Sequence, residues 1–373
     1  MVDAFGSALS TAPDAATAAR EACASVARDL AGAAADLAVV FATPGLMANA
    51  AGIAAIVDAE LGPGALIGCT AEGVIGTGRE LERPPGLSLW AAALPGGAVE
   101  AFAIDPSTEP LPGGDGATVV LADPFSFPPG VLRGADGRPM AGAIVGGMAS
   151  GGREPGDHRL VMGDTVRAAG AVGVHVPGAR VLVSQGCRPV GPEMTITAVA
   201  GDGVIAELAG RPALQRVREV VEGLPADERA LVEQGVLAGL VVDGNKPQLE
   251  QGDFLIRGIA GGDPSTGALL VGEDVRVGQV MRLQVRDHAS AHADLHRALS
   301  EVPAGTAQGA LLFACNGRGT RMFPDPHHDA RALADALGPV PVAGLFCNGE
   351  IGPVGGRAYL HGFTATMAVF TSA

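Results

Sequence analysis

Short apolar runs that end at glycine- or proline-rich turns recur along the chain. Leu37–Ala42, Ala65–Cys69 and Leu87–Ala93 are apolar and bounded by turn residues, which predicts buried strands. Between the first two, Met47–Leu61 has the length and spacing of a helix that ends at Gly62. The pattern therefore predicts a chain in which strands and helices alternate.

The same criteria predict elements over most of the remaining chain. The predicted helical segments are Asp14–Gly32, Pro128–Gly134, residues 211–224, residues 225–242, His288–Val302 and Asp329–Leu337. The predicted strands are Val99–Ile104, Thr118–Ala122, Ala143–Met148, Leu160–Ala168, Ala171–Val176, segments within Arg180–Ala200, Phe254–Ile259, Ala268–Val271, Val280–Val285, Ala310–Cys315, Val342–Cys347 and Tyr359–Phe370. Leu160–Ala168 and Ala171–Val176 are expected to form a hairpin, and residues 1–13 to be irregular.

The order of elements near the N-terminus recurs near the C-terminus. The early unit reads AVVFATPG, a helix, ALIGCTAEGVIG and SLWAAAL; the late unit reads ALLFACNG, a helix, VAGLFCNGEIG and FTATMAVF. In both, a cysteine closes a strand and a glutamate follows three residues later: Cys69 precedes Glu72, and Cys347 precedes Glu350. A unit of about 80 residues is too long for a solenoid repeat, so the recurrence predicts duplicated strand–helix–strand–strand units.

These elements predict an α/β (α+β) fold with two domains. Each domain is expected to contain mixed, largely antiparallel sheets flanked by helices. The composition changes at Arg211, where two predicted helices begin, each with proline in its first turn. We therefore predict a helical lead-in at residues 1–34, a first domain at residues 35–225 and a second at residues 226–373.

Composition and charge exclude several classes of partner. The chain has 373 residues, 47% of them hydrophobic and 17% charged, which is typical of a globular protein with a sizeable core. Its net charge of −15 argues against binding to nucleic acid or to anionic membrane surfaces. The N-terminus lacks the basic and apolar regions of a secretory signal, and the five cysteines form no C-x-x-C pair. We expect a protein of the reducing cytoplasm.

The glycine-rich loop after Val342–Phe346 carries the first group of candidate site residues. Cys347, Asn348, Gly349 and Glu350 follow a buried strand, where an amide and a carboxylate can bind a polar ligand and glycine lets backbone N–H groups approach it. The structural alternative is that Glu350 caps backbone donors in a tight turn. Cys347 is interpreted as a buried core thiol, with a nucleophile assisted by His361 as the catalytic alternative.

A second candidate loop follows Ala310–Cys315. Its residues Asn316, Gly317 and Arg318 resemble an anion-receiving turn, because a guanidinium can pair with a ligand carboxylate through two hydrogen bonds. The alternative is a salt bridge from Arg318 to Glu350 or to another acid of the protein. An arginine held by a protein carboxylate can still orient a ligand, so the two interpretations are compatible.

Metal and cofactor signals are weak. His288, His292 and His296 recur every four residues on a predicted helix, but partly buried packing beside its apolar face explains them better than a metal site. The glycine-rich segments match neither of the common nucleotide-binding patterns. We predict no metal and no cofactor, with haem as the alternative because an axial histidine in an apolar pocket is sufficient chemically.

Three ordered motifs carry a resemblance to a known family. They are FLIRGIAGGDPSTGALLVGEDVRVGQVMRLQVRD at 254–287, GALLFACNGRGTRMF at 309–323 and GLFCNGEIGPVGGRAYLHGFTA at 344–365, with weaker support from GCTAEGVIG and SLWAAALPGG. With these motifs the chain resembles the FIST family of bacterial and eukaryotic sensory proteins, which have a FIST N-terminal and a FIST C-terminal domain. The chain departs from the family pattern at Glu72, which precedes Gly73, whereas many members have the acid after a glycine.

The resemblance implies a cytoplasmic small-ligand-binding sensory or signal-transduction protein, with amino acids among the ligands. Relatives occur beside signalling domains, some are linked to haem, and eukaryotic members are F-box substrate adaptors. This sequence has no room for an attached output domain, so we expect an unidentified signalling protein as partner. The predicted ligand-binding residues are Glu72, Asn316, Gly317, Arg318, Cys347, Asn348, Gly349 and Glu350. The expected class is not an enzyme; the alternatives are a thiol-dependent enzyme using Cys347 and a protein-interaction scaffold.

Overall fold

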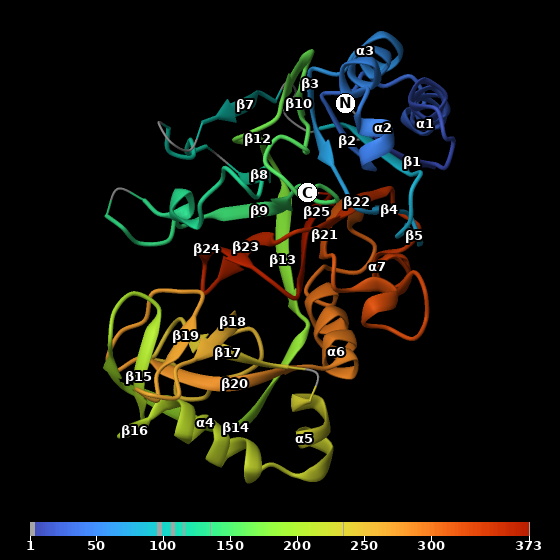
Figure 1. Ribbon diagram of the computed structural model, residues 1–373. Coiled ribbons are helices and arrows are strands. Elements are labelled where there is room, and N and C mark those ends of the chain that lie inside the picture. The colour runs from blue at the N-terminus through green and yellow to red at the C-terminus, as the bar shows by residue number, and fades with distance from the viewer. Residues whose placement is uncertain are drawn as a thin grey trace. The chain divides into compact units, whose positions relative to one another are not determined.

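The computed structural model describes residues 4–94, 99–105, 109–114, 116–134, 136–233 and 235–372, and has a mixed α+β fold (Figure 1). The helices are α1 (Ala15–Leu30), α2 (Pro44–Met47), α3 (Ala50–Leu61), α4 (Ala213–Glu222), α5 (Ala226–Val232), α6 (His288–Leu299) and α7 (His328–Leu337). Short 3₁₀ turns lie at Pro129–Leu132 and Gly319–Arg321. The predicted fold class, with several mixed sheets and flanking helices, is confirmed.

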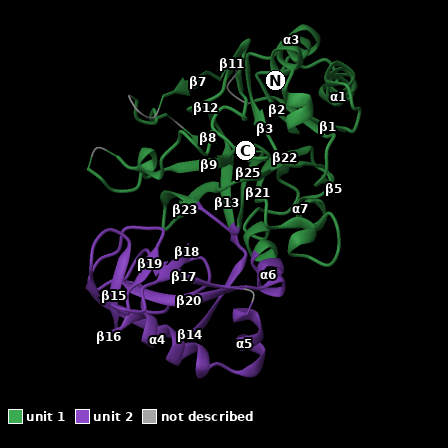
Figure 2. Ribbon diagram, viewed as in Figure 1, with its two compact units in different colours: residues 1–183, 295–360, 364–373 green, residues 184–294, 361–363 purple. Residues whose placement is uncertain are grey.

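The chain divides into two compact units (Figure 2). Unit 1 contains residues 1–183, 295–360 and 364–373, and unit 2 contains residues 184–294 and 361–363. This division in space follows different lines from the two domains predicted along the sequence, which stay a prediction.

Unit 1 is built from three copies of one strand arrangement. The first repeat contains β1 (Ala4–Ser10), β2 (Leu37–Ala42), β3 (Ala65–Thr70), β4 (Val74–Gly76), β5 (Arg79–Leu81) and β6 (Leu87–Ala93). The second contains β7 (Ala101–Ile104), β8 (Ala117–Ala122), β9 (Ala143–Met148), β10 (Leu160–Met162), β11 (Thr165–Arg167) and β12 (Ala171–Val176). The third contains β13 (Ala179–Gln185), β21 (Ala307–Cys315), β22 (Val342–Cys347), β23 (Glu350–Val354), β24 (Arg357–His361) and β25 (Thr364–Thr371). The last two residues of β13 and the last residue of β24 are counted with unit 2.

The three repeats share one strand order. Their sheets run β1-β6-β2-β3, β7-β12-β8-β9 and β13-β25-β21-β22, and in each the last two strands are parallel. The predicted duplication of the early and late units is therefore present in the fold, and a third copy lies between them in the sequence.

Each repeat sends a hairpin into the sheet of another repeat. The β4–β5 hairpin of the first repeat pairs with β22 of the third, β10–β11 of the second pairs with β3, and β23–β24 of the third lies beside β9. The exchange is cyclic and completes three six-stranded sheets. The inner faces of all three sheets contribute to one buried core, to which Phe41, Leu121 and Phe313 belong. Unit 1 is consequently one folded body in which no repeat is self-contained.

A glycine fixes the register of each parallel strand pair. Gly68, Gly146 and Gly344 lie opposite a residue of the preceding parallel strand. A Cβ atom on any of them would stand 1.9–2.3 Å from that residue's carbonyl oxygen, which only glycine avoids. These glycines therefore align the three repeats residue by residue.

This alignment shows that the two Cys-x-x-Glu segments are not equivalent. Counted from Gly68 and Gly344, Cys347 lies at the position of Ala71, and Glu350 lies at the position of Val74. The two cysteine–glutamate pairs occupy different places in their repeats, so the common spacing does not identify equivalent sites.

The N-terminal segment is also an ordered part of unit 1. Residues 4–10, predicted to be irregular, form β1, which pairs with β6 along its whole length and contacts α1. Helix α1 begins as predicted, because the Asp14 carboxylate accepts the Thr17 N–H at 2.8 Å and caps the first turn. The small residues of β1 have weak strand propensity, and pairing with a buried neighbour decides their conformation.

Three further predictions about local structure are wrong. Leu160–Ala168 does not pair with Ala171–Val176; it forms the β10–β11 hairpin, while β12 pairs with β7 and β8. Residues 225–242 are not one helix, because Gly235 adopts a positive φ between α5 and strand β17 (Val236–Val241). Tyr359–Phe370 is not one strand, since β24 and β25 lie in different sheets.

Unit 2 contains a closed antiparallel sheet. Its strands are β14 (Cys187–Val199), β15 (Val204–Leu208), β16 (Arg211–Pro212), β17, β18 (Phe254–Gly262), β19 (Leu269–Val271) and β20 (Val280–Arg286). They run β14-β20-β17-β18-β19-β15-β16, and an additional pairing of β14 with β15 closes the ring. Cys187, Leu237 and Phe254 are among its core residues. Within the described ranges of the whole chain, no helix has the length and apolar character needed to cross a membrane.

Candidate functional site

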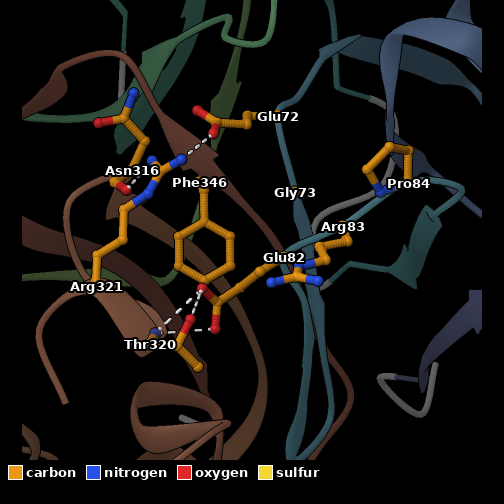
Figure 3. Close-up of a pocket in the computed structure, with 9 residues that line it drawn as sticks. All are labelled: Glu72, Gly73, Glu82, Arg83, Pro84, Asn316, Thr320, Arg321 and Phe346. Atoms are coloured by element: carbon orange, nitrogen blue, oxygen red, sulfur yellow. Dashed lines mark hydrogen bonds and ion pairs between the residues drawn. The ribbon is translucent and has the colours of Figure 1, made fainter. Parts of the chain in front are cut away.

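A pocket of about 380 Å³ lies within unit 1, where the first and third repeats meet (Figure 3). The first repeat contributes the turn between β3 and β4 and the segment after β5, and the third contributes β22 and the segment after β21. The lining residues are Glu72, Gly73, Glu82, Arg83, Pro84, Asn316, Thr320, Arg321 and Phe346. The exchanged β4–β5 hairpin therefore carries one wall of the pocket to the other repeat.

An ion pair between repeats forms one side of the pocket. The Arg321 Nη2 atom lies 2.5 Å from Oε1 of Glu72, and Arg321 Nη1 donates to the Asn316 carbonyl at 2.6 Å. The Glu72 side chain is 33% exposed and that of Arg321 57% exposed, so both charges remain accessible to solvent. The side-chain hydrogen bond to Glu72 raises the pKa of Arg321 above its usual value.

The opposite side carries a second set of polar groups. The Glu82 carboxylate accepts the Thr320 N–H at 3.0 Å and the Thr320 hydroxyl at 2.6 Å. Arg83 is exposed and has no hydrogen bond or ion pair with any described residue. In the view of Figure 3 the Arg83 guanidinium and the Glu72–Arg321 pair lie on opposite sides of the Phe346 ring. Arg83 is thus a cation of the lining that no described residue neutralises.

Two family models match consecutive parts of the chain. The FIST N domain matches residues 36–211, and the FIST C domain matches residues 213–353. The chain belongs to the FIST family. FIST domains are generally associated with sensory signal transduction.

Relatives of this FIST protein match over almost its full length. "Uncharacterized protein Rv0628c" of Mycobacterium tuberculosis (strain ATCC 25618 / H37Rv) is 44% identical over 387 residues, which are 98% of this chain and 99% of the relative. "Uncharacterized protein Mb0898c" of Mycobacterium bovis (strain ATCC BAA-935 / AF2122/97) is 44% identical over 388 residues, which are 98% of each chain. Their names state no ligand or activity.

Two of the predicted site residues, Glu72 and Asn316, line the pocket. The structure brings them together because the β4–β5 hairpin crosses to β22. The other predicted residues, Gly317, Arg318, Cys347, Asn348, Gly349 and Glu350, lie outside its lining. The pocket lining therefore includes few of the predicted loop residues. It also includes the segment after β5, which was not among the predicted site residues.

Arg318 is buried in an ion pair. Its Nε and Nη2 atoms donate to the two carboxylate oxygens of Asp329 at 2.6 and 2.8 Å, and both side chains are 1% exposed. Burial alone would raise the pKa of Asp329, but the Arg318 guanidinium and its hydrogen bonds hold that pKa well below its usual range. The Arg318 guanidinium also lies 5.2 Å from the Phe323 ring centre. Two of the three guanidinium nitrogens of Arg318 are thus bonded to a protein carboxylate, and Nη1 is buried without a hydrogen-bond partner among the described residues.

Glu350 is the first residue of β23, in a stretch that was predicted to be a loop. Its Oε2 accepts the Thr364 N–H at 3.1 Å and the Thr364 hydroxyl at 2.7 Å, while Oε1 has no partner among the described residues. Burial raises the pKa of Glu350 to about 8, so it is largely uncharged at neutral pH. Glu350 thus binds a backbone donor, as the structural alternative expected, but the donor belongs to β25 and not to a tight turn around Glu350.

Cys347 is buried at the end of β22, and the two residues after it bond to β9. The Cys347 thiol is fully buried, and burial together with the Glu350 carboxylate raises its pKa well above the usual value. The Asn348 N–H donates to the Met148 carbonyl, and the Gly349 carbonyl accepts the Met148 N–H. His361, the alternative general base, belongs to unit 2. Such an environment disfavours the thiolate that nucleophilic catalysis needs.

The sequence patterns missed most of the lining, including Glu82, Arg83, Thr320 and Arg321. Arg321 and Glu72 are 249 residues apart, and nothing in their local sequences shows that the two segments meet. None of the lining residues is a histidine, cysteine, methionine or tyrosine, the usual axial ligands of haem, so this pocket does not fit that cofactor. Within the described ranges, no group of three or more His, Cys, Asp or Glu residues is placed to hold a metal ion.

Proposed function

We propose that this FIST protein is a cytoplasmic sensor that binds a small polar ligand bearing a carboxylate, such as an amino acid. The proposal rests on which charged side chains of the pocket have partners within the protein. Glu72 is paired with Arg321 and Glu82 is bonded to Thr320, whereas Arg83 has no partner among the described residues. An anionic group on the ligand would satisfy this cation through charge-assisted hydrogen bonds.

The dimensions of the pocket support a small ligand. Ligand pockets generally have volumes of roughly 300–1,000 Å³. At about 380 Å³ this pocket is near the small end of that range. The Phe346 ring supplies an apolar surface, and Glu72 and Asn316 supply acceptors for an ammonium or hydroxyl group. These groups together suit a compact molecule with polar groups at one or both ends.

Signalling requires that the ligand favour one arrangement of the protein over another. A ligand here would contact Arg83, which follows the exchanged β5 strand, and Arg321, which follows β21 of another repeat. Binding would therefore stabilise the docked β4–β5 hairpin relative to arrangements in which it is displaced. A partner protein that recognises the docked arrangement would then respond to the ligand, as a population shift requires.

A ligand screen with two arginine variants tests the proposal. Thermal unfolding is measured with common amino acids and with small carboxylates of central metabolism, since a ligand bound to the native state raises the melting temperature. For the strongest hit, Arg83→Gln is expected to weaken binding at least about tenfold. Arg79→Gln is the matched control, because Arg79 is an exposed arginine of β5 outside the lining.

Two outcomes would contradict the proposal. If no compound raises the melting temperature, the sensor function stated here is wrong and a protein-interaction scaffold becomes the better interpretation. If a ligand binds equally well to the Arg83→Gln and wild-type proteins, ligand binding does not depend on this pocket.

A further inference from the structure

Three equivalent residues lie where the repeats of unit 1 converge. Glu72, Ser150 and Asn348 each lie four residues after the glycine that fixes the register of their repeat. The backbone N–H of each residue points toward a neighbouring repeat. In two cases it donates to a backbone carbonyl there, and in the third it donates to a hydroxyl that is itself bonded to such a carbonyl. The three contacts form a closed ring of hydrogen bonds around the repeats.

Two contacts of the ring are direct backbone bonds. The Ser150 N–H donates to the Thr70 carbonyl at 3.1 Å, and the Asn348 N–H donates to the Met148 carbonyl at 3.2 Å. Thr70 and Met148 both lie two residues after their register glycine, so the two bonds are equivalent. By the same count, the third direct bond would run from the Glu72 N–H to the Phe346 carbonyl.

The third contact is interrupted by a side chain. The Glu72 N–H donates to Oγ of Ser150 at 2.7 Å, and that hydroxyl donates in turn to the Phe346 carbonyl at 2.5 Å. Ser150 is 1% exposed and belongs to the second repeat, whereas Glu72 and Phe346 belong to the first and third. One hydroxyl thus connects all three repeats at a single point.

The inserted hydroxyl sets the spacing of two pocket residues. A direct N–H···O=C bond holds its heavy atoms about 2.9 Å apart, whereas a bridging hydroxyl with near-tetrahedral geometry holds them roughly 4 Å apart. Glu72 and Phe346 both line the pocket described above, and the other two contacts of the ring lack such an insertion. The pocket therefore lies at the junction where a hydroxyl bridges this contact of the ring, while the Phe346 N–H still donates directly to the Gly73 carbonyl at 3.0 Å.

We propose that Ser150 is a positioning residue of the ligand pocket, whose hydroxyl separates Glu72 from Phe346 and so sets the place of the Glu72–Arg321 pair. The inference rests on the proposed function of the pocket, but its geometric content does not require a ligand. Without the hydroxyl, the Glu72 N–H either closes directly onto the Phe346 carbonyl or loses its partner. Both results move the Glu72 carboxylate relative to Arg321, and direct closure narrows the pocket.

The test compares Ser150→Ala with Ser88→Ala. Ser88 is a matched control, since it is fully buried and its hydroxyl donates to the Ile75 carbonyl at 2.7 Å, yet it does not line the pocket. Crystal structures give the distance from the Glu72 nitrogen to the Phe346 oxygen. Phenylglyoxal modification, read by peptide mass spectrometry, reports how firmly Arg321 is held, with Arg83 as the internal reference.

We expect Ser150→Ala to shorten the Glu72–Phe346 distance or leave the amide without a partner, and to change the relative reactivity of Arg321 several-fold. Ser88→Ala should alter neither quantity, although both variants lose one buried hydrogen bond. An unchanged distance and reactivity in Ser150→Ala, or equal changes in both variants, would overturn the proposal.

A second pair of variants covers the case in which Ser150→Ala does not fold. Ser150→Thr keeps the hydroxyl and Ser150→Val replaces it with a methyl group of similar shape, so only the valine variant should alter Arg321 reactivity. Identical behaviour of the two would show that the hydroxyl is not responsible. Because these measurements need no ligand, a negative ligand screen would refute the proposed function without deciding the role of Ser150.

Discussion

Arg318 and Asp329 form a two-point ion pair in which each side chain is 1% exposed. The sequence motif around Arg318 suggested a loop that receives a ligand anion, and the structure places a protein carboxylate there. Asp329 lies in the first turn of α7, and Arg318 precedes the segment that lines the pocket. The pair therefore anchors the pocket segment to a helix.

Asp329→Ala should strongly destabilise the protein. The substitution leaves the Arg318 guanidinium buried without its counter-charge, and breaking such a pair costs about 3–5 kcal/mol. Chemical denaturation measures the loss, with Glu301→Ala as control. Glu301 pairs with Arg297 on the surface, where both side chains are about half exposed, and pairs of that kind contribute only about 0.3–0.5 kcal/mol.

The double variant Arg318→Met/Asp329→Leu separates the cost of an unpaired charge from the value of the pair. Replacing both members by apolar residues removes the uncompensated charge, so the double variant should be clearly more stable than Asp329→Ala. Equal stability of the single and double variants would contradict this account of the ion pair.

Glu80 should make the stability of the folded protein decrease as the pH rises. It is 3% exposed, and its Oε1 accepts the Ala330 N–H at 3.0 Å. Burial and the nearby Asp329 carboxylate raise the pKa of Glu80 from 4.5 to about 7. The folded protein therefore holds this proton more tightly than the unfolded chain does. The resulting stabilisation is complete below pH 4.5 and is lost as the pH rises to about 7.

Glu80→Gln should remove that dependence. The variant is neutral throughout, and its amide oxygen can still accept from Ala330. Its free energy of unfolding, relative to wild type, should rise between pH 4.5 and 7 by an amount on the order of 3 kcal/mol and then level off. Urea denaturation at a series of pH values gives this difference. A flat difference would contradict the raised pKa, and the exposed Glu301→Gln controls for loss of charge.

Cys347 should resist alkylation in the folded protein. Burial and the Glu350 carboxylate raise the pKa of its thiol, and the reactive species is the thiolate. We expect iodoacetamide near neutral pH to modify Cys347 at least about 100-fold more slowly in the native protein than in urea, as measured by peptide mass spectrometry. Rapid stoichiometric labelling of the native protein would instead support the thiol-dependent enzyme.

Local elements of unit 1 could be predicted from sequence because apolar runs end at turn residues. Leu37–Ala42 and Leu87–Ala93 match β2 and β6 at both ends, and Gly62 ends α3 as predicted. These features depend on residues close together in the chain. Their physical causes, burial of apolar runs and the left-handed conformation of a terminal glycine, are visible in a short segment.

The sheet that each hairpin joins could not be predicted. Val74 pairs with Leu345 and Glu350 pairs with Gly147, and no local pattern specifies those partners. The same limit explains why Cys-x-x-Glu was misleading: without the pairing register, equal spacing resembles equal position. It also explains why Glu72 was identified as a site residue while its partner Arg321 was not.

Gly344→Ala tests the register on which the alignment of the repeats depends. A Cβ at Gly344 would stand 2.1 Å from the Leu312 carbonyl oxygen, and a backbone atom of a neighbouring strand cannot move aside cheaply. The variant should lose about 2 kcal/mol of stability or more, because overpacking forces β21 and β22 apart. Gly45→Ala is the matched control, since no heavy atom lies within 4 Å of a Cβ placed there. Thermal and chemical unfolding of both variants provide the measurement. If Gly344→Ala is as stable as Gly45→Ala, the close approach of the two strands is wrong, and the equivalence of Glu72, Ser150 and Asn348 loses its basis.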